Sequence, residues 1–197
     1  MAEHVVLFAG PMGAGKTTAI RALSEIDVIS TEAANSDRTR VDKDTTTVAL
    51  DYGEIVLGED TRVRLYGMPG QRRFDFMWDV LRQRAMGLVL LINADAPDPL
   101  DDLDAFLEEF CELHDRGGIV VCVTRADLAD GANLADYAAI VNARIPGATI
   151  PIFTTDARNG QDMRTCLLAL VINIEMRGAQ GIAAPGDAPA SSFQGHF

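Results

Sequence analysis

The 197-residue chain has few aromatic residues (6%), few cysteines, and markedly fewer basic than acidic side chains. Lys and Arg total 17 against 29 Asp and Glu, so the formal net charge is -12. A surface of this sign repels a nucleic-acid backbone and an anionic membrane leaflet, so we expect neither as a partner. Any phosphate-bearing ligand would have to be attracted by a local field, from oriented backbone N–H groups, a lysine and a bound cation.

The three cysteines, Cys111, Cys122 and Cys166, are widely spaced and include no Cys-x-x-Cys pair, and the three histidines are too dispersed to indicate a metal site. Reduced thiols are therefore expected. No apolar run reaches the about 18 residues of a membrane helix, and neither a basic leader nor a C-terminal cysteine box is seen. We expect a cytoplasmic protein with no membrane span and no lipid anchor.

Short runs rich in Val, Ile and Leu alternate with longer amphipathic stretches, a pattern typical of a parallel sheet covered by helices on both faces. The sequence thus predicts an α/β fold with a mostly parallel six-stranded sheet. Strands are predicted over His4–Ala9, Thr46–Tyr52, Arg62–Tyr66, Gly87–Asn93, Ile119–Thr124 and Ile150–Phe153. Helices are predicted over Lys16–Ser24, Phe74–Gln83, Leu100–His114, Leu134–Ala143 and Gln161–Met176.

Two polar segments set the expected organisation. Residues 25–45 are rich in Ser, Thr, Asp and Arg and are too long for an ordinary connection, so they are expected to form a functional loop. Residues 178–197 are rich in Gly, Ala, Pro and Ser and are expected to be a disordered tail. One folded domain is therefore predicted over residues 1–177.

The segment from Gly10 to Thr17 reads GPMGAGKT and matches the P-loop pattern G-x-x-x-x-G-K-[ST]. Its glycines let the backbone wrap around phosphates, Lys16 would reach the β- and γ-phosphates, and the Thr17 hydroxyl would bind Mg²⁺. The alternative is a glycine-rich turn before a helix; the position after an apolar strand favours the phosphate cradle. The residues predicted to bind nucleotide here are Gly10, Gly13, Ala14, Gly15, Lys16, Thr17 and Thr18.

Four further segments resemble the switch I, switch II and two guanine-recognition motifs of Ras-like small GTPases: 47–52 (TVALDY), 67–71 (GMPGQ), 124–127 (TRAD) and 155–158 (TDAR). The resemblance spans residues 4–176 and is closest to a bacterial branch, the gliding-motility and cell-polarity GTPases and those of roadblock operons. It implies a three-layer P-loop NTPase fold (the Ras-like G domain), GTP or GDP as ligand, Mg²⁺ as cofactor, slow GTP hydrolysis and a roadblock-domain regulator.

The resemblance also assigns the residues of the two switches. Thr47 matches the threonine that binds Mg²⁺ and the γ-phosphate, with Thr45 and Thr46 as adjacent competitors. Gly70 matches the glycine whose amide meets the γ-phosphate, and Gln71 matches the catalytic glutamine that positions the attacking water. The alternatives are that the threonines only begin a strand and that Gln71 is a surface residue of a Pro-Gly turn.

Asp127 matches the carboxylate that recognises guanine. A carboxylate only accepts hydrogen bonds, and guanine presents N1–H and N2–H donors side by side, which adenine lacks. Arg125 would lie over the base, and the Ala157 amide would donate to the guanine O6 oxygen. Alternatively, Asp127 caps the turn at residues 128–133. The remaining residues predicted to bind the nucleotide in these two segments are Thr124, Asp156 and Arg158.

Three positions depart from the family pattern. Thr124 stands where the family has the asparagine that braces the P-loop, so the segment keeps the base-reading carboxylate Asp127 but loses that asparagine. Gly67 replaces the aspartate that holds Mg²⁺ through water, so either metal binding is weaker or Asp51 substitutes. Met12 is bulky and would obstruct an arginine inserted by a partner, which favours a resident arginine from this chain. The candidates are Arg38, Arg40, Arg72 and Arg73.

The favoured function is a GTP/GDP switch with slow, partner-stimulated hydrolysis. A P-loop ATPase or kinase is a second hypothesis, and it should show an acceptor pocket or lid and no guanine carboxylate. A third is a nucleotide-binding scaffold with negligible turnover, which Gly67 makes plausible.

Overall fold

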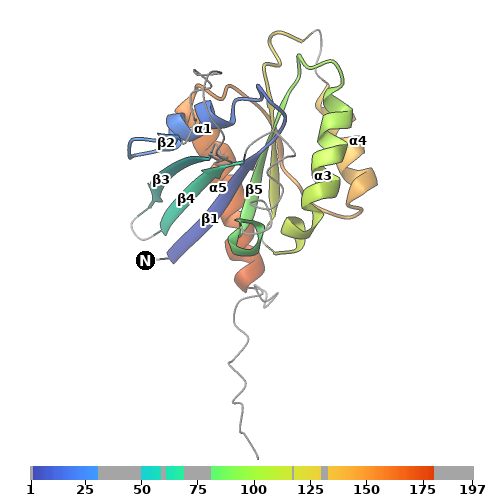
Figure 1. Cartoon of the computed structure of the whole chain (residues 1–197). Helices are drawn as coiled ribbons and strands as arrows, with labels where there is room; N and C mark the ends of the chain where they lie inside the picture. The colour runs from blue at the N-terminus through green and yellow to red at the C-terminus, as the bar shows by residue number, and fades with distance from the viewer. Residues whose placement is uncertain are drawn as a thin grey trace, which may run out of the picture.

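The computed structural model describes residues 2–30, 50–58, 61–68, 81–116, 118–129 and 133–179. Within these ranges the chain forms a seven-stranded sheet in the order β2-β3-β4-β1-β5-β6-β7, with helices on both faces (Figure 1). The elements are β1 (Ala2–Ala9), α1 (Lys16–Leu23), β2 (Ile29–Ser30), β3 (Asp51–Leu57), β4 (Thr61–Gly67), β5 (Gly87–Asn93), α3 (Pro99–Arg116), β6 (Ile119–Thr124), α4 (Leu134–Arg144), β7 (Ile152–Thr155) and α5 (Gly160–Ala179).

The centre of the sheet is parallel and buried on both faces. β1 pairs with β4 and β5, and β5, β6 and β7 follow in parallel register. β6 is buried at every residue and β5 at all but its last, which explains their unbroken apolar sequences and why both were predicted to the residue. β7 begins two residues later than predicted, after Pro151, which has no amide hydrogen to donate to a ladder.

The other edge of the sheet is antiparallel and corrects two predictions. β2 adds a seventh strand, formed by Ile29 and Ser30 within the stretch expected to be a loop. β3 covers residues 51–57 rather than 46–52, of which 46–49 lie outside the described residues. Its internal Gly53 is unfavourable in strands, but a Cβ there would lie 2.9 Å from the Ile20 side chain, so glycine lets α1 pack closely.

Each face of the sheet has its own hydrophobic core. Alternate residues of β1 point to opposite sides: Val6 and Phe8 pack under α1 and α5, whereas Leu7 and Ala9 pack under α3 and α4. Residues 81–84 are helical, one residue beyond the predicted end of the helix at 74–83, whose earlier part lies outside the described residues. None of the described helices is both long and apolar enough to cross a bilayer.

Candidate nucleotide site

Three glycines shape the loop between β1 and α1. Gly10, Gly13 and Gly15 have φ angles of 138°, 84° and 99°, a region that L side chains rarely adopt. A Cβ on Gly10 would lie 2.0 Å from the Leu91 carbonyl oxygen, and one on Gly15 would lie 2.9 Å from the Ala157 Cβ. The loop can follow this path only if residue 10 is a glycine. At Gly15 the loop packs against Ala157, in the segment predicted to recognise the base.

The N-terminus of α1 is available for an anion. Its N-cap is Gly15, which offers no side-chain cap, and the first turn contains no acidic residue. The first N–H groups of a helix have no acceptor within the helix, and together with the helix dipole they favour phosphate at this point. Ala14 is buried beneath the loop, while Met12 and Thr18 are exposed.

Lys16 is held across the loop. Its Nζ donates to the carbonyl oxygens of Gly10 and Pro11, both at 2.8 Å. Burial lowers the pKa of Lys16 to about 8, and the negative charge of Asp51 offsets part of that effect. A bound phosphate would favour the charged ammonium and so raise this pKa again.

The hydroxyl of Thr17 contacts a carboxylate from the neighbouring strand. Thr17 Oγ1 donates to Asp51 Oδ2 at 2.5 Å, and Ser30 Oγ donates to Asp51 Oδ1 at 2.8 Å. Mg²⁺ prefers hard oxygen ligands and uses few protein groups beside substrate phosphates, so this donor set fits it. No cluster of three or more His, Cys, Asp or Glu side chains suited to a metal is found in the part of the chain that the structure describes.

Thr124, at the end of β6, braces the cradle. Its buried hydroxyl donates to the Ala14 carbonyl oxygen at 3.1 Å and lies 3.4 Å from the Ile92 carbonyl oxygen. Although the asparagine of the family pattern is absent, the shorter threonine side chain reaches the same loop from a buried strand. The segment after β6 is thereby tied to the phosphate cradle.

The next residue, Arg125, has a φ of 55°, the only positive φ of a non-glycine residue in the described ranges. Its guanidinium pairs with Asp95, just beyond β5, at 3.2 Å, and its side chain is 49% exposed. The Leu128 amide donates to the Arg125 carbonyl oxygen at 3.0 Å and closes the turn that carries Asp127. Asp95 was not predicted, and its position directly after an apolar strand was the signal that could have indicated it.

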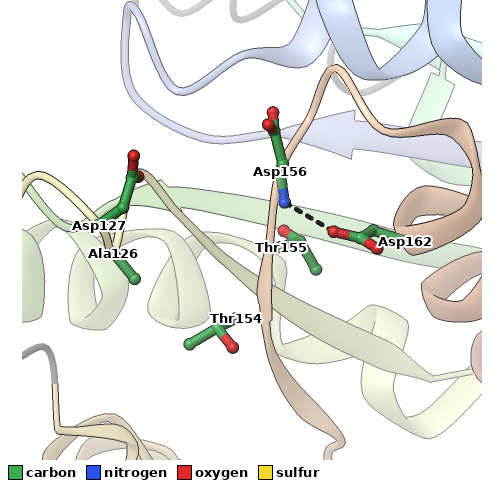
Figure 2. A pocket seen from close by; sticks show the side chains of 6 residues that line it. All are labelled: Ala126, Asp127, Thr154, Thr155, Asp156 and Asp162. Atoms are coloured by element: carbon green, nitrogen blue, oxygen red, sulfur yellow. Dashed lines mark hydrogen bonds between the residues drawn. The ribbon is translucent and has the colours of Figure 1, made fainter.

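Beside this turn lies a pocket of about 250 Å³. Figure 2 shows the carboxylates of Asp127 and Asp156 at one side of it, on different loops and pointing the same way. The Asp156 amide donates to Asp162 at 3.1 Å, which anchors the second loop to α5. The pocket is lined by Ala126, Asp127, Thr154, Thr155, Asp156 and Asp162.

The loop after β7 carries two opposite charges that form an ion pair. Arg158 makes a two-pronged ion pair with Asp156, at 2.8 Å for the closer contact of Nη2 and Oδ2. This pair lowers the pKa of Asp156 to about 2 and raises that of Arg158, which the charge of Asp127 also favours. Ala157 between them is buried, against Gly15 of the cradle.

The structure thus gathers the predicted residues of the P-loop and of segments 124–127 and 155–158 along the carboxyl ends of β1, β6 and β7. This edge is where α/β sheets bind ligands. Thr47, Gly70 and Gln71 lie outside the described residues, as do the four candidate arginines. The three cysteines are free, with Cys122 and Cys166 buried and Cys111 exposed.

A glycine-shaped cradle between a strand and a helix, next to a polar pocket at the ends of parallel strands, defines a P-loop nucleotide-binding protein. Residues 26–143, more than half of the chain, match a family described as "Conserved hypothetical ATP binding protein". The chain belongs to this family. The matched region begins after the cradle and includes Asp51, Gly67 and Asp127.

A similarity to a curated protein covers part of the chain. Intraflagellar transport protein 22 of Chlamydomonas reinhardtii is 30% identical over 131 residues, which covers 62% of this chain. The chain spans 64% of that relative's length.

Proposed function

We propose that this protein is a guanine-nucleotide switch that binds GTP and GDP with Mg²⁺ and hydrolyses GTP slowly. The observation that carries the proposal is the link between cradle and base loop: Thr124 bonds to Ala14, and Asp127 follows three residues later at the rim of a pocket. A phosphate chain in the cradle would place its nucleoside toward that pocket. When bound, Mg²⁺ would neutralise charge on the β- and γ-phosphate oxygens.

Selectivity for guanine rests on Asp127. Its carboxylate offers acceptors to the N1–H and N2–H groups of guanine, whereas adenine would leave those acceptors unpaired. In support of the proposal, Asp127 lies in the turn closed by the Leu128 amide and lines the pocket. The description of the family names ATP, which makes an ATPase the second candidate.

The switch and hydrolysis rest on the resemblance. Thr47 and Gly70 would meet the γ-phosphate, and Gln71 would orient the attacking water. Met12, which is 79% exposed at the cradle, supports activation through a resident arginine rather than an inserted one. A roadblock-domain protein would order Gln71 and that arginine, and we propose a cytoplasmic location for the pair.

The nucleotide is tested by identifying what the purified full chain releases on denaturation and by competing GTP against ATP for the same site. We expect guanine nucleotide to be released and GTP to be preferred over ATP at least a hundredfold. A preference of this size is common where the wrong ligand would leave polar groups of the site without hydrogen-bond partners. Adenine nucleotide in the released fraction, or equal competition, would favour the ATPase.

Hydrolysis is tested by turnover of the wild type and of Gln71→Leu, each with and without a roadblock-domain partner. Partner stimulation of the wild type alone is expected, because leucine cannot orient a water molecule. Equal stimulation in both proteins would remove Gln71 from its role. Absence of turnover in the wild type under all conditions would support the scaffold hypothesis.

A further inference from the structure

The antiparallel pairing of β3 and β4 places the carboxylate of Asp51 opposite Gly67. Position 67 is where the Ras-like pattern has an aspartate. Gly67 is the last residue of β4, and Asp51, the first residue of β3, is its partner in the antiparallel register. Residues paired in this way are about 4.5–5.5 Å apart at their Cα atoms. The acidic group that position 67 lacks is thus present one strand away.

The Asp51 side chain occupies the space that a side chain on residue 67 would need. A Cβ on Gly67 would lie 3.0 Å from the Asp51 Cβ and 3.1 Å from its Oδ2 atom. Glycine at 67 and aspartate at 51 are therefore complementary: the absence of one side chain makes room for the other.

Asp51 is also aimed at the hydroxyl that a P-loop uses for Mg²⁺. Its Oδ2 accepts from Thr17 Oγ1 at 2.5 Å, and Ser30 holds the other oxygen at 2.8 Å. A hydroxyl that donates its proton to a carboxylate keeps its lone pairs free for a cation.

We infer that Asp51 supplies the carboxylate of the Mg²⁺ site, in place of an acidic residue at position 67. This inference rests on the proposed nucleotide binding. It predicts that metal binding is retained despite Gly67, and that β2 contributes through Ser30, which fixes the carboxylate beside Thr17.

The test measures how Mg²⁺ slows release of fluorescent N-methylanthraniloyl GDP and, separately, the matching ADP derivative, from the full chain. Asp51→Asn keeps the size of the side chain and removes its charge; we expect the Mg²⁺ concentration for half-maximal slowing to rise at least tenfold. Asp27→Asn, an exposed aspartate just before β2, is the matched control and should behave as the wild type. Unchanged Mg²⁺ dependence in Asp51→Asn would overturn the inference.

A swap variant provides a second, independent readout if Asp51→Asn folds poorly. In the double variant Asp51→Gly with Gly67→Asp, removal of the Asp51 side chain takes away two of the three atoms nearest to a Cβ at position 67 and leaves the flexible tip of Ile20, at 3.0 Å. Mg²⁺ dependence should return to within about threefold of the wild type, whereas Asp51→Gly alone should lose it. A double variant as impaired as Asp51→Gly would contradict the inference.

The same measurements distinguish failure of the guanine proposal from failure of the inference about Asp51. A protein that retains only the adenine derivative would defeat the guanine proposal, yet a Mg²⁺ shift in Asp51→Asn measured with that derivative would still support the role of Asp51. Mn²⁺ binding followed by electron paramagnetic resonance gives the metal affinity without any dependence on turnover.

Discussion

The two ends of the candidate nucleotide site are built on different kinds of sheet. The base end follows β6 and β7, parallel strands whose ends carry Asp127 and Asp156. The metal end rests on the antiparallel edge, where β3 brings Asp51 to Thr17. At the proposed base end the candidate groups stand at the positions that the sequence motifs predict, whereas at the proposed metal end the candidate carboxylate lies one strand away from the motif position.

This difference shows what a motif encodes. In a buried parallel strand the apolar run fixes the register, so the residues that follow it have a determined position. At an antiparallel edge the same point in space can be reached from either strand of a pair, because paired residues are neighbours. A site can therefore keep its chemistry while the motif that normally carries it is altered.

The largest effect on stability is expected from a substitution in the phosphate cradle, which both ends of the site share. Gly10→Ala would place a Cβ 2.0 Å from the Leu91 carbonyl at a φ of 138°, so we expect a loss of about 3 kcal/mol or more in the free energy of unfolding. Gly13 also has a positive φ, of 84°, but a Cβ there would meet no atom within 4 Å, so Gly13→Ala should cost only about 1 kcal/mol. Urea unfolding of both variants measures the difference, and equal losses would contradict the packing argument.

The next effect tests whether the base end is tied to the cradle. Thr124→Val removes the hydroxyl but keeps the shape, leaving the Ala14 carbonyl oxygen without this donor, and should cost about 1–3 kcal/mol in stability. Nucleotide affinity should fall with it. Thr124→Ser retains a hydroxyl and should recover most of both losses in denaturant unfolding and nucleotide titration; recovery of neither would indicate that the methyl group, not the bond, matters.

A pH series tests the phosphate end. The pKa of Lys16 is lowered from 10.5 to about 8 by burial, so the empty protein loses this proton above pH 8, while a bound phosphate would retain it. Nucleotide affinity should therefore decrease above pH 8, by up to about tenfold per pH unit. The stability of the nucleotide-free protein changes in the opposite direction. Between pH 8 and 10.5 Lys16 binds fewer protons in the folded state than in the unfolded chain, so it makes the free energy of unfolding rise with pH.

Affinities from titrations at pH 7 to 10 measure the first trend, with Lys16→Arg as a control whose guanidinium does not titrate in this range. Identical pH profiles for the two proteins would contradict the role of Lys16.

The smallest effect is expected at the exposed pair of Arg158 and Asp156. Arg158→Ala should leave the thermal midpoint unchanged within error, because exposed ion pairs contribute little. It should weaken nucleotide binding by less than about tenfold. Without the Arg158 cation the negative charges of Asp127 and Asp156 at the pocket are no longer offset, and they would repel the anionic nucleotide. Added salt should reduce the deficit, and a deficit insensitive to salt would indicate a direct contact instead.

Much of the central fold could be predicted because single apolar runs determine β5 and β6 and a known loop pattern marks the cradle. The edge could not: β3 begins with Asp51 and contains Gly53, and its register depends on pairing with β4 and on close packing of α1. β2 is only two residues long, too short to leave a periodic signal. The brace from Thr124 was missed for a similar reason, since a hydrogen bond to a residue 110 positions earlier is a property of the fold.

The central claim, that the pocket beside the cradle reads guanine through Asp127, is tested most directly by Asp127→Asn in a competition between GTP and xanthosine triphosphate. Xanthine carries a carbonyl where guanine carries its amino group, and an asparagine amide can donate to that carbonyl while accepting from N1–H. We predict that GTP affinity falls by about a hundredfold or more and that xanthosine triphosphate becomes the preferred ligand. Unchanged GTP affinity in Asp127→Asn would contradict the account.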